Sequence, residues 1–458
     1  MSANPSSASA GAVSRRRFLK NSAAALAGGA LVSPLLSAFP QLAPASALGR
    51  DGTVAPSNRV AIGVLGMQQG WDSFRNCLSF KDVEGVALCD VDAQRLERRL
   101  QETRSRANGR SAKGWRDFRE MFAKAGLDGV ILAAPDHWHG VMCVAAARAG
   151  IDIYGEKPLA HTLREGRAIV DAVRRHGRVW QTGMWQRSTG NFTRAVQLVR
   201  SGRIGKVKRV HVGTGGDFGN PSGVPRYADV TRGAAVDRGT IGKPPAHLDY
   251  EMWVGPAPWF DYDPRVTHYH WRWVLNFGGG NLLDWVSHHV DIALWGLDFD
   301  RTAPVKVTGS ANFATNPPWD APRTYNYELN YADGTVVTVD STMGAKWFGE
   351  NGQWIFVNRG QLTASDKSIL AYNPPAEAVA GVYVSRNHWR NWIDCIKTRR
   401  ETITPAETAH NTATAGHLGL TAAITGRTIR WDAATETIPD DPAADALLTP
   451  TIRAPWSL

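Results

Sequence analysis

Short apolar runs alternate with amphipathic segments over the first part of the chain. Four runs predict buried parallel strands, at residues 60–66, 85–90, 129–134 and 151–154, of which the first is continuously apolar and ends in glycine. Helices are expected between them, one from about Trp71 and one over residues 140–149. This alternation predicts a doubly wound parallel sheet with helices on its faces.

From about residue 186 the hydrophobic pattern changes to a period of two. Apolar and polar positions alternate at residues 206–212, 326–331 and 334–339. The Asp333-Gly334 pair predicts a hairpin turn between the last two segments, and the pattern predicts an open, mostly antiparallel sheet. Further elements are expected as helices at residues 388–397 and 408–426 and as a long glycine- and proline-rich loop over a site at residues 213–245.

The turn after the first strand carries an incomplete glycine fingerprint of dinucleotide-binding folds. It reads Gly66-Met67-Gln68-Gln69-Gly70, with Gln68 in place of the second glycine, so we expect a more distant phosphate or a shifted turn. Asp90 ends the second strand 20 residues after Gly70, where these folds place the carboxylate that accepts the ribose hydroxyls. Because a carboxylate there repels a 2′-phosphate, and no arginine adjoins it in the sequence, NAD is expected rather than NADP.

These patterns together predict an α/β fold with two structured domains. Residues 59–185 are expected to form a Rossmann NAD-binding domain. Residues 186–458 are expected to form an α+β domain with a large open sheet.

A polar stripe is predicted on a helix over residues 281–295. Asp284, His288, Asp291 and Trp295 recur there at helical spacing, whereas a stripe that faces a core is apolar. The stripe is therefore either solvated surface or the wall of a site, and the preceding glycines and neighbouring aromatic residues favour the wall. A neutral histidine can accept a hydroxyl proton, and Asp284 would fix its tautomer or hold a neighbouring hydroxyl.

The first residues have the features of an export signal. Arg15 and Arg16 precede a mildly apolar run over residues 23–39 and the small-residue cleavage pattern Ala45-Ser46-Ala47. The run is interrupted by glycine, serine and proline, which disfavours a membrane anchor. We expect a twin-arginine signal peptide over residues 1–47, a linker over residues 48–58, and a periplasmic or extracellular protein with no stable membrane anchor after cleavage.

Charge and cysteine content exclude several classes of partner. Charged residues make up 21% and hydrophobic residues 43% of the chain, as in a soluble globular protein. The net charge is +10, of which four positive charges lie in the leader and the rest are spread along the chain, so no nucleic-acid partner is expected. The four cysteines are scattered and form no CxxC pair, so we expect buried thiols and no metal site.

Tryptophan is unusually frequent, with 18 residues in the chain. Six of them fall between residues 253 and 295. A flat indole face complements the CH face of a sugar ring, so a dense cluster fits a carbohydrate ligand, although core packing is the alternative for any one tryptophan.

The chain resembles the Gfo/Idh/MocA family, which includes glucose-fructose oxidoreductase and inositol dehydrogenase. The resemblance starts from Gly66 and Asp90 and covers nearly all of the chain after the leader. The motifs that carry it are Ala134 to His139 (APDHWH), Gly155 to Leu159 (GEKPL), Trp253 to Pro258 (WVGPAP), Trp271 to Trp273 (WRW), Gly278 to Gly280 and Asp284 to Asp291 (DWVSHHVD). These motifs and the tail, Trp431-Asp432 and Arg453 to Trp456, look like the secreted twin-arginine subgroup.

The resemblance implies site residues and partners. It implies Lys157, Asp284 and His288 as catalytic residues, with Lys157 between the nicotinamide and the substrate oxygen, where it stabilises the developing alkoxide. The expected cofactor-binding residues are Gly66, Met67, Gln68, Gly70, Asp90, Pro135, His139, Glu156, Lys157 and Arg187. A homo-oligomer through the C-terminal sheet is also implied.

Three functions remain open at this stage. The first is an oxidoreductase that acts on a sugar or cyclic polyol by hydride transfer and keeps its NAD bound. The second is a redox-neutral glycoside hydrolase or lyase that oxidises a sugar carbon transiently, and the third is a sugar-binding protein without activity. Lys157 in an intact Glu-Lys-Pro motif favours the first, because the glycosidase branch tends to lack that lysine. If His288 is not the base, Asp284 or His270 would take that role.

Overall fold

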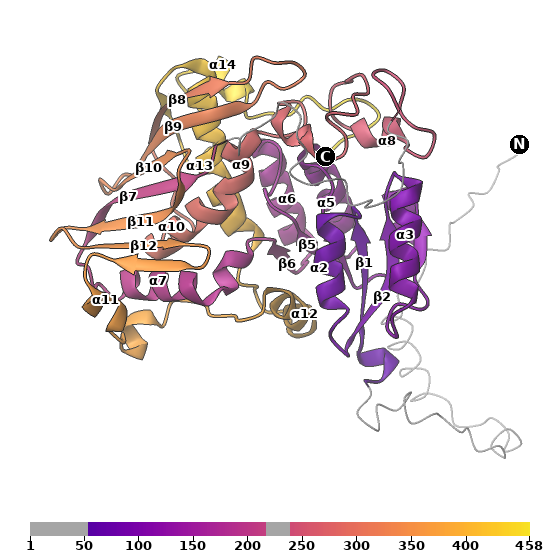
Figure 1. Cartoon of the computed structure of the whole chain (residues 1–458), viewed down its shortest axis with the longest axis horizontal. Helices are drawn as coiled ribbons and strands as arrows, with labels where there is room; N and C mark the ends of the chain where they lie inside the picture. The colour runs from indigo at the N-terminus through magenta and orange to yellow at the C-terminus, as the bar shows by residue number, and fades with distance from the viewer. Residues whose placement is uncertain (1–53, 217–238) are drawn as a thin grey trace, which may run out of the picture.

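The computed structural model describes residues 54–216 and 239–458 (Figure 1). The predicted signal peptide, the linker up to residue 53 and residues 217–238 of the predicted loop lie outside these ranges. None of the helices in the described ranges has the length and hydrophobicity needed to span a membrane.

The N-terminal half is built on a six-stranded parallel sheet in the order β3-β2-β1-β4-β5-β6. Its strands are β1 (Val60–Leu65), β2 (Val83–Cys89), β3 (Lys113–Trp115), β4 (Gly129–Leu132), β5 (Asp152–Gly155) and β6 (Trp180–Thr182). The helices are α2 (Gln69–Cys77), α3 (Ala93–Arg104), α4 (Phe118–Lys124), α5 (His139–Arg148) and α6 (Leu163–Arg175). All four predicted strands are confirmed, whereas the pattern missed β3 and β6, which have only three residues each.

The turn from β1 into α2 depends on a glycine with a left-handed backbone. Gly66 has φ of +87°, and a Cβ atom there would lie 2.4 Å from the carbonyl oxygen of Ala133. Only glycine fits both requirements. The turn therefore brings the N-terminus of α2 close to the end of β4.

The C-terminal half contains an eight-stranded sheet in the order β13-β12-β11-β7-β10-β9-β8-β14. Its strands are β7 (Val207–Thr214), β8 (Lys306–Phe313), β9 (Pro322–Asn330), β10 (Val336–Asp340), β11 (Met343–Gly349), β12 (Trp354–Asn358), β13 (Gln361–Ala364) and β14 (Ile429–Arg430). Only the β7–β10 pair is parallel, and the sheet is otherwise antiparallel, as expected. The predicted hairpin joins β9 to β10, with Gly334 at φ of +81°.

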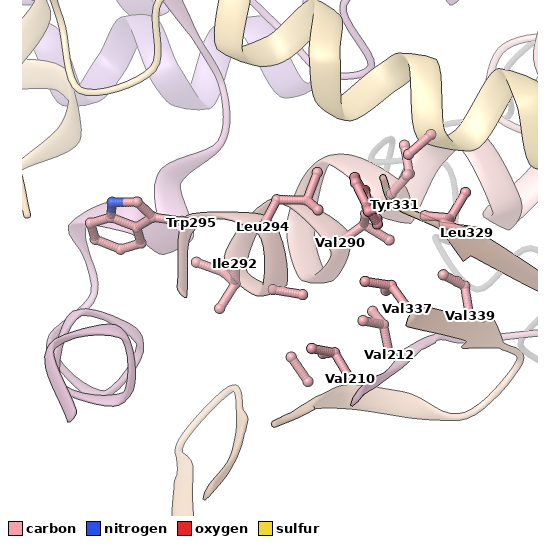
Figure 2. Close-up of a cluster of buried hydrophobic side chains, with 14 of the residues drawn as sticks. Val210, Val212, Val290, Ile292, Leu294, Trp295, Leu329, Tyr331, Val337 and Val339 are labelled. Atoms are coloured by element: carbon pink, nitrogen blue, oxygen red, sulfur yellow. The ribbon is translucent and has the colours of Figure 1, made fainter. Parts of the chain in front are cut away.

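Helices cover one face of this sheet and separate it from the Rossmann half (Figure 1). The helices that pack on the sheet are α7 (Gly190–Arg200), α9 (Gly280–Trp285), α10 (Asp291–Leu297) and α13 (Ala406–Thr425). The other helices of this half are α8 (Tyr250–Val254), α11 (Lys367–Ala371), α12 (His388–Thr398) and α14 (Pro442–Ala446). Alternate residues of the central strands point at α10 and at the turn before it, and Figure 2 shows Val210, Val212, Val337 and Val339 beneath Val290 and Ile292. This buried layer holds the helical segment that carries His288 against the sheet.

The segment predicted as a helix, residues 281–295, is helical throughout, but it does not keep one α-helical period. Helix α9 ends at Trp285, a π-helical turn spans Val286–Val290, and α10 begins at Asp291. A π-turn holds more residues than an α-turn, so the residues beyond it rotate away from the face that Asp284 occupies. Such turns occur frequently at functional sites.

The C-terminal elements return to the Rossmann half. Trp392 and Ile396 of α12 are buried in the same cluster as Ile62 and Val64 of β1. Near the end of the chain, the ring of Trp456 packs edge-on against Trp138, with centroids 4.7 Å apart. The division of the chain at residues 185 and 186 stays a prediction, and the core of the first half includes residues from the end of the chain.

Candidate active site

A cavity of about 1070 Å³ lies at the carboxyl ends of the parallel strands, where the two halves meet. Its walls come from the turn after β1, the ends of β2, β4 and β5, the segment 268–273, the helix α9 with its π-turn, and Arg359. The volume is at the upper end of the roughly 300–1,000 Å³ of small-molecule sites, and carboxyl strand ends are where open α/β sheets bind ligands.

Nine of the predicted site residues line this cavity. They are Gly66, Met67, Gln68, Asp90, Pro135, Glu156, Lys157, Asp284 and His288. The sequence separates the first of these from the last by more than 200 residues, and the fold brings them to one space.

Asp90 holds the glycine turn as well as facing the cavity. One carboxylate oxygen accepts a hydrogen bond from the Met67 amide at 2.9 Å and the other from the Asp92 amide at 2.9 Å. Burial raises the pKa of Asp90, against the hydrogen bond from Asp92 and the charge of Arg95. Each oxygen keeps a further lone pair, so the carboxylate can accept ribose hydroxyls while it fixes the turn.

The same end of the cavity has a basic wall that the sequence pattern did not indicate. Its arginines are Arg75 of α2, Arg95 and Arg99 of α3, and Arg116 after β3. Arg95 and Arg99 are four residues apart on α3, and this helical spacing is the one signal that could have identified them. No arginine adjoins Asp90 in the sequence, yet the fold brings arginines to the same cavity.

Three predicted cofactor-binding residues lie behind the cavity wall. Gly70 packs on β1, where a Cβ atom would lie 2.9 Å from the carbonyl oxygen of Leu65. The ring nitrogens of His139 contact the carbonyl oxygens of Pro158 at 2.8 Å and of Ala134 at 3.0 Å. These two residues support the wall of the cavity and do not face it.

Arg187, the third, belongs to a buried ion-pair cluster. Its guanidinium group bonds to Asp291 at 2.6 Å and Asp300 at 2.8 Å, and it lies over the ring of Trp295 at 5.0 Å. The predicted polar stripe is therefore divided: Asp284 and His288 face the cavity, whereas Asp291 and Trp295 pack against Arg187. The π-turn between them is the physical reason.

Lys157 and Asp284 form an ion pair in the wall of the cavity. The Lys157 Nζ atom donates to Asp284 Oδ1 at 2.8 Å, and Arg272 Nε lies 3.5 Å from the same oxygen. Burial acts to raise the pKa of Asp284, but Lys157 and Arg272 outweigh it and lower the pKa below its ordinary value. Asp284 is thus a carboxylate that holds the lysine, and Arg272 is a contact that the sequence did not indicate.

His288 lies between two indole rings. The centroid of its ring is 5.1 Å from that of Trp285 and 6.2 Å from that of Trp185, and its Nδ1 atom makes no hydrogen bond within the described structure. Burial, then the charges of Lys157 and Arg359, lower its pKa well below 6.5. The imidazole is neutral and able to accept a proton. Of the two expected roles of Asp284, fixing the tautomer of His288 is not seen in the described structure, where Asp284 binds Lys157 instead.

Arg359 completes the wall around His288 from a distant hairpin. It lies between β12 and β13, and its guanidinium carbon is 4.4 Å from the ring centroid of Trp285 and 4.7 Å from that of Trp185. Cation–π contacts of this kind hold a planar guanidinium in one orientation. Nothing in the sequence around Arg359 indicates this position.

His270, the alternative base, does not line the cavity. Its ring is buried beside Trp273 and Trp319, with centroids 5.6 and 6.3 Å away. Burial and the charge of Arg272 lower its pKa. The structure therefore separates it from the group formed by Lys157, Asp284 and His288.

The cavity fits a dinucleotide. The close approach that Gly66 permits, the carboxylate of Asp90 and the basic wall suit a pyrophosphate and a ribose at one end, and the ion pair of Lys157 lies at the other. Within residues 54–216 and 239–458 there is no group of three histidine, cysteine or acidic side chains that could hold a metal ion.

Two family models match the chain. Residues 60–184 match the NAD-binding Rossmann fold of an oxidoreductase family, and residues 236–458 match the C-terminal alpha/beta domain of the same family. Together they cover most of the chain after the predicted leader.

Among curated proteins, inositol 2-dehydrogenase of Salmonella typhimurium is 29% identical over 170 residues, 37% of this chain and 47% of its own length. A glycosyl hydrolase family 109 protein of Stenotrophomonas maltophilia is 26% identical over 279 residues, 56% of this chain and 51% of its own length. The chain thus spans about half the length of the curated relatives it matches.

Among solved structures, the WlbA dehydrogenase of Bordetella pertussis, in complex with NADH and UDP-GlcNAcA, has a TM-score of 0.59 at 16% identity. The alignment covers 82% of this chain and 98% of that one. At this identity the likeness shows the fold alone.

Proposed function

The chain belongs to the Gfo/Idh/MocA family of oxidoreductases with an NAD-binding Rossmann domain, and from this premise we propose that it oxidises a hydroxyl group of a sugar or cyclic polyol by hydride transfer. One observation carries the proposal. Lys157, Asp284 and His288 lie together at the end of the cavity opposite the glycine turn, within a wall that includes Trp185, Trp271, Trp273 and Trp285. The cation, the base and the aromatic surface are what alcohol oxidation on a sugar ring requires.

Each residue of the group has a separate task. Bound NAD supplies the acceptor for the hydride. Lys157, with one N–H donated to Asp284, directs its remaining donors at the substrate oxygen and stabilises negative charge there. Neutral His288 accepts the hydroxyl proton while the carbinol C–H bond breaks and its electron pair leaves with the hydride, so that the carbinol becomes a carbonyl. Asp284 holds the lysine in place.

The test is a pair of variants of the catalytic group. Lys157→Ala and His288→Ala are each expected to lower turnover by roughly 10² to 10⁴-fold, while the dissociation constant of NAD changes little. Nicotinamide absorbance is measured with a panel of sugars and polyols, and cofactor binding by fluorescence. The double variant is expected to lose less than the product of the two effects, because both residues serve one transition state.

A His288→Ala enzyme within a few-fold of wild type would overturn the assignment of the base. The panel also includes aryl glycosides, because a family 109 glycosyl hydrolase protein aligns with 279 residues of the chain. Release of the aryl group without net change in nicotinamide absorbance would favour the redox-neutral alternative.

We also propose that the protein is exported by the twin-arginine route and works outside the cytoplasm. The paired arginines Arg15 and Arg16 and the small residues before position 48 support this. Because no free NAD pool exists there, the cofactor would be retained through turnover, and a second substrate would restore it. A homo-oligomer through the C-terminal sheet is proposed on the resemblance alone.

A further inference from the structure

Asp136 is a buried carboxyl group in the cavity for which the sequence suggested no role. It follows Pro135 at the carboxyl end of β4, begins a short 3-10 turn (Asp136–Trp138), and is 4% exposed. It lines the cavity together with Lys157, Arg272 and Asp284.

Asp136 differs from the other acids of this wall because its carboxyl group receives no hydrogen bond within the described residues. Asp90 accepts two backbone amides, Glu156 accepts from the Ser73 hydroxyl and the Lys157 amide, and Asp284 accepts from Lys157 Nζ. Within residues 54–216 and 239–458, no donor reaches the carboxyl group of Asp136. A buried carboxylate without donors is unfavourable unless a ligand supplies the missing partner or the group takes up a proton.

The charges around Asp136 favour the protonated form. Lys157 and Arg272 are the nearby cations, and both already contact Asp284, whose negative charge opposes a second one beside it. Burial raises the pKa of Asp136 well above its ordinary value, Asp284 and Glu165 act in the same direction, and Arg272 and Lys157 act against them. The surroundings thus favour different forms of the two acids, the ionised form of Asp284 and the protonated form of Asp136.

We propose that Asp136 is a substrate-binding residue whose neutral carboxyl group exchanges two hydrogen bonds with a hydroxyl of the sugar or polyol. Its O–H donates to the hydroxyl oxygen and its carbonyl oxygen accepts the hydroxyl hydrogen. The carboxyl group then recognises both the oxygen and the hydrogen of the hydroxyl. An analogue that lacks this hydroxyl leaves the buried carboxyl group of Asp136 unpaired and is rejected. The inference rests on the proposed function and adds a group that selects the substrate.

The hydroxyl is assigned to the substrate because of the neighbours of Asp136. Lys157 and Asp284 belong to the group around the reacting oxygen, whereas the ribose of the adenosine would lie near Asp90. The nicotinamide ribose also carries hydroxyls, and the experiment separates the two sources by measuring cofactor and polyol binding independently.

The experiment compares Asp136→Asn with Asp136→Ala in the purified holoenzyme. Asparagine is neutral and keeps one donor and one acceptor, so kcat/KM for the best polyol of the panel is expected to stay within about five-fold of wild type. Alanine is expected to raise KM by about 10 to 100-fold with an unchanged dissociation constant for NAD. Asp284→Asn is expected to show the opposite pattern, a large loss of kcat with a conservative change, because Asp284 acts as an anion.

Asp171→Asn, an exposed change on α6, is the matched control and is expected to be silent. Thermal melting establishes that each variant is folded. Equal damage from Asn and Ala would show that Asp136 must be ionised and would overturn the proposal, as would a loss confined to NAD binding or no change in either variant.

If no polyol is turned over, calorimetric titration of myo-inositol into the holoenzyme replaces KM. A polyol that binds to wild type and not to Asp136→Ala would then support the proposal while the proposed reaction fails, and no binding to wild type would overturn both.

Discussion

At the scale of single residues, burial in one cavity has opposite consequences for side chains of the same type. Lys157 and Arg272 lower the pKa of Asp284 against the effect of its burial, whereas burial and the charge of Asp284 raise the pKa of Asp136. Burial raises the pKa of Glu156 to about 7, although the charge of Lys157 opposes this. The identity of an acid in the sequence therefore does not give its protonation state, which depends on the cation that the fold places beside it.

Asp90→Asn is expected to weaken NAD binding by about ten-fold and to weaken NADP binding much less. The carboxylate can accept ribose hydroxyls and repels a 2′-phosphate, and asparagine removes the negative charge and one of the two acceptor oxygens. Dissociation constants for the two cofactors, measured by fluorescence, check this. The variant also perturbs the bonds to Met67 and Asp92. Equal losses for both cofactors would show that Asp90 acts on the turn alone.

At the scale of elements, long segments with a clear period were predicted well and short or irregular ones were not. Helices α12 and α13 lie where the apolar pattern placed them, and the Asp333-Gly334 hairpin is confirmed. Strands of three residues are too short for a period to show, and the π-turn at Val286–Val290 depends on packing against β7 and α13. The turn decides which polar residues of the segment reach the cavity.

Helix α6 contains a glutamate that makes stability depend on pH. Glu165 forms a capping box with Thr162, and burial raises its pKa from 4.5 to about 7. The folded state therefore keeps a proton that the unfolded state releases between these values, and stability falls as pH rises from about 4.5 to 7, by at most about 1.4 kcal/mol per pH unit. Below this range the stabilisation is fully present.

Glu165→Gln is expected to remove this loss, because glutamine keeps the capping box and does not ionise. Urea denaturation of the variant and wild type at pH 5 and pH 8 measures the difference. Glu97→Gln, an exposed change on α3, serves as the control. A wild-type stability that falls no more than that of Glu165→Gln between the two pH values would contradict the argument.

At the scale of the whole molecule, the two halves share their cores. Trp392 of α12 is fully buried, and its ring packs edge-on against Tyr154 of β5 with centroids 5.7 Å apart. A Cβ atom on Gly129 of β4 would lie 2.9 Å from the same indole. The parallel sheet therefore closes only when residues from the end of the chain have packed on it.

Trp392→Ala is expected to destabilise the protein by about 3–5 kcal/mol, because the sheet cannot fill the space left by the indole. Denaturant unfolding measures the change. Trp259→Ala, at a side chain that is 52% exposed, is the control and is expected to cost less than about 1 kcal/mol. Similar losses in the two variants would show that α12 packs loosely on the sheet.

Export is also a property of the whole molecule, because the twin-arginine route moves folded proteins. Replacing Arg15 and Arg16 by lysine is expected to leave the protein in the cytoplasm. Immunoblots of periplasmic, secreted and cytoplasmic fractions measure this. Unchanged export of the variant would contradict the twin-arginine assignment.

The sequence by itself determined the features that depend on neighbouring residues. Unbroken apolar runs form the buried strands, Gly66 permits the turn that no other residue can make, and the position of Lys157 after β5 places it at the carboxyl edge of the sheet. Each of these follows from local backbone preference and from the period of side chains along one element.

Only the tertiary structure decided which distant groups meet. It places Arg359 beside His288 and pairs Asp284 with Lys157 and Arg272. It also buries Arg187 in a cluster with Asp291. Except for Arg272 and Asp284, which are 12 positions apart, these contacts join residues about 70 to 130 positions apart, and no pattern along a single element records them. They depend on how two sheets and their helices pack, because burial and the nearest opposite charge settle both the position and the charge of each group.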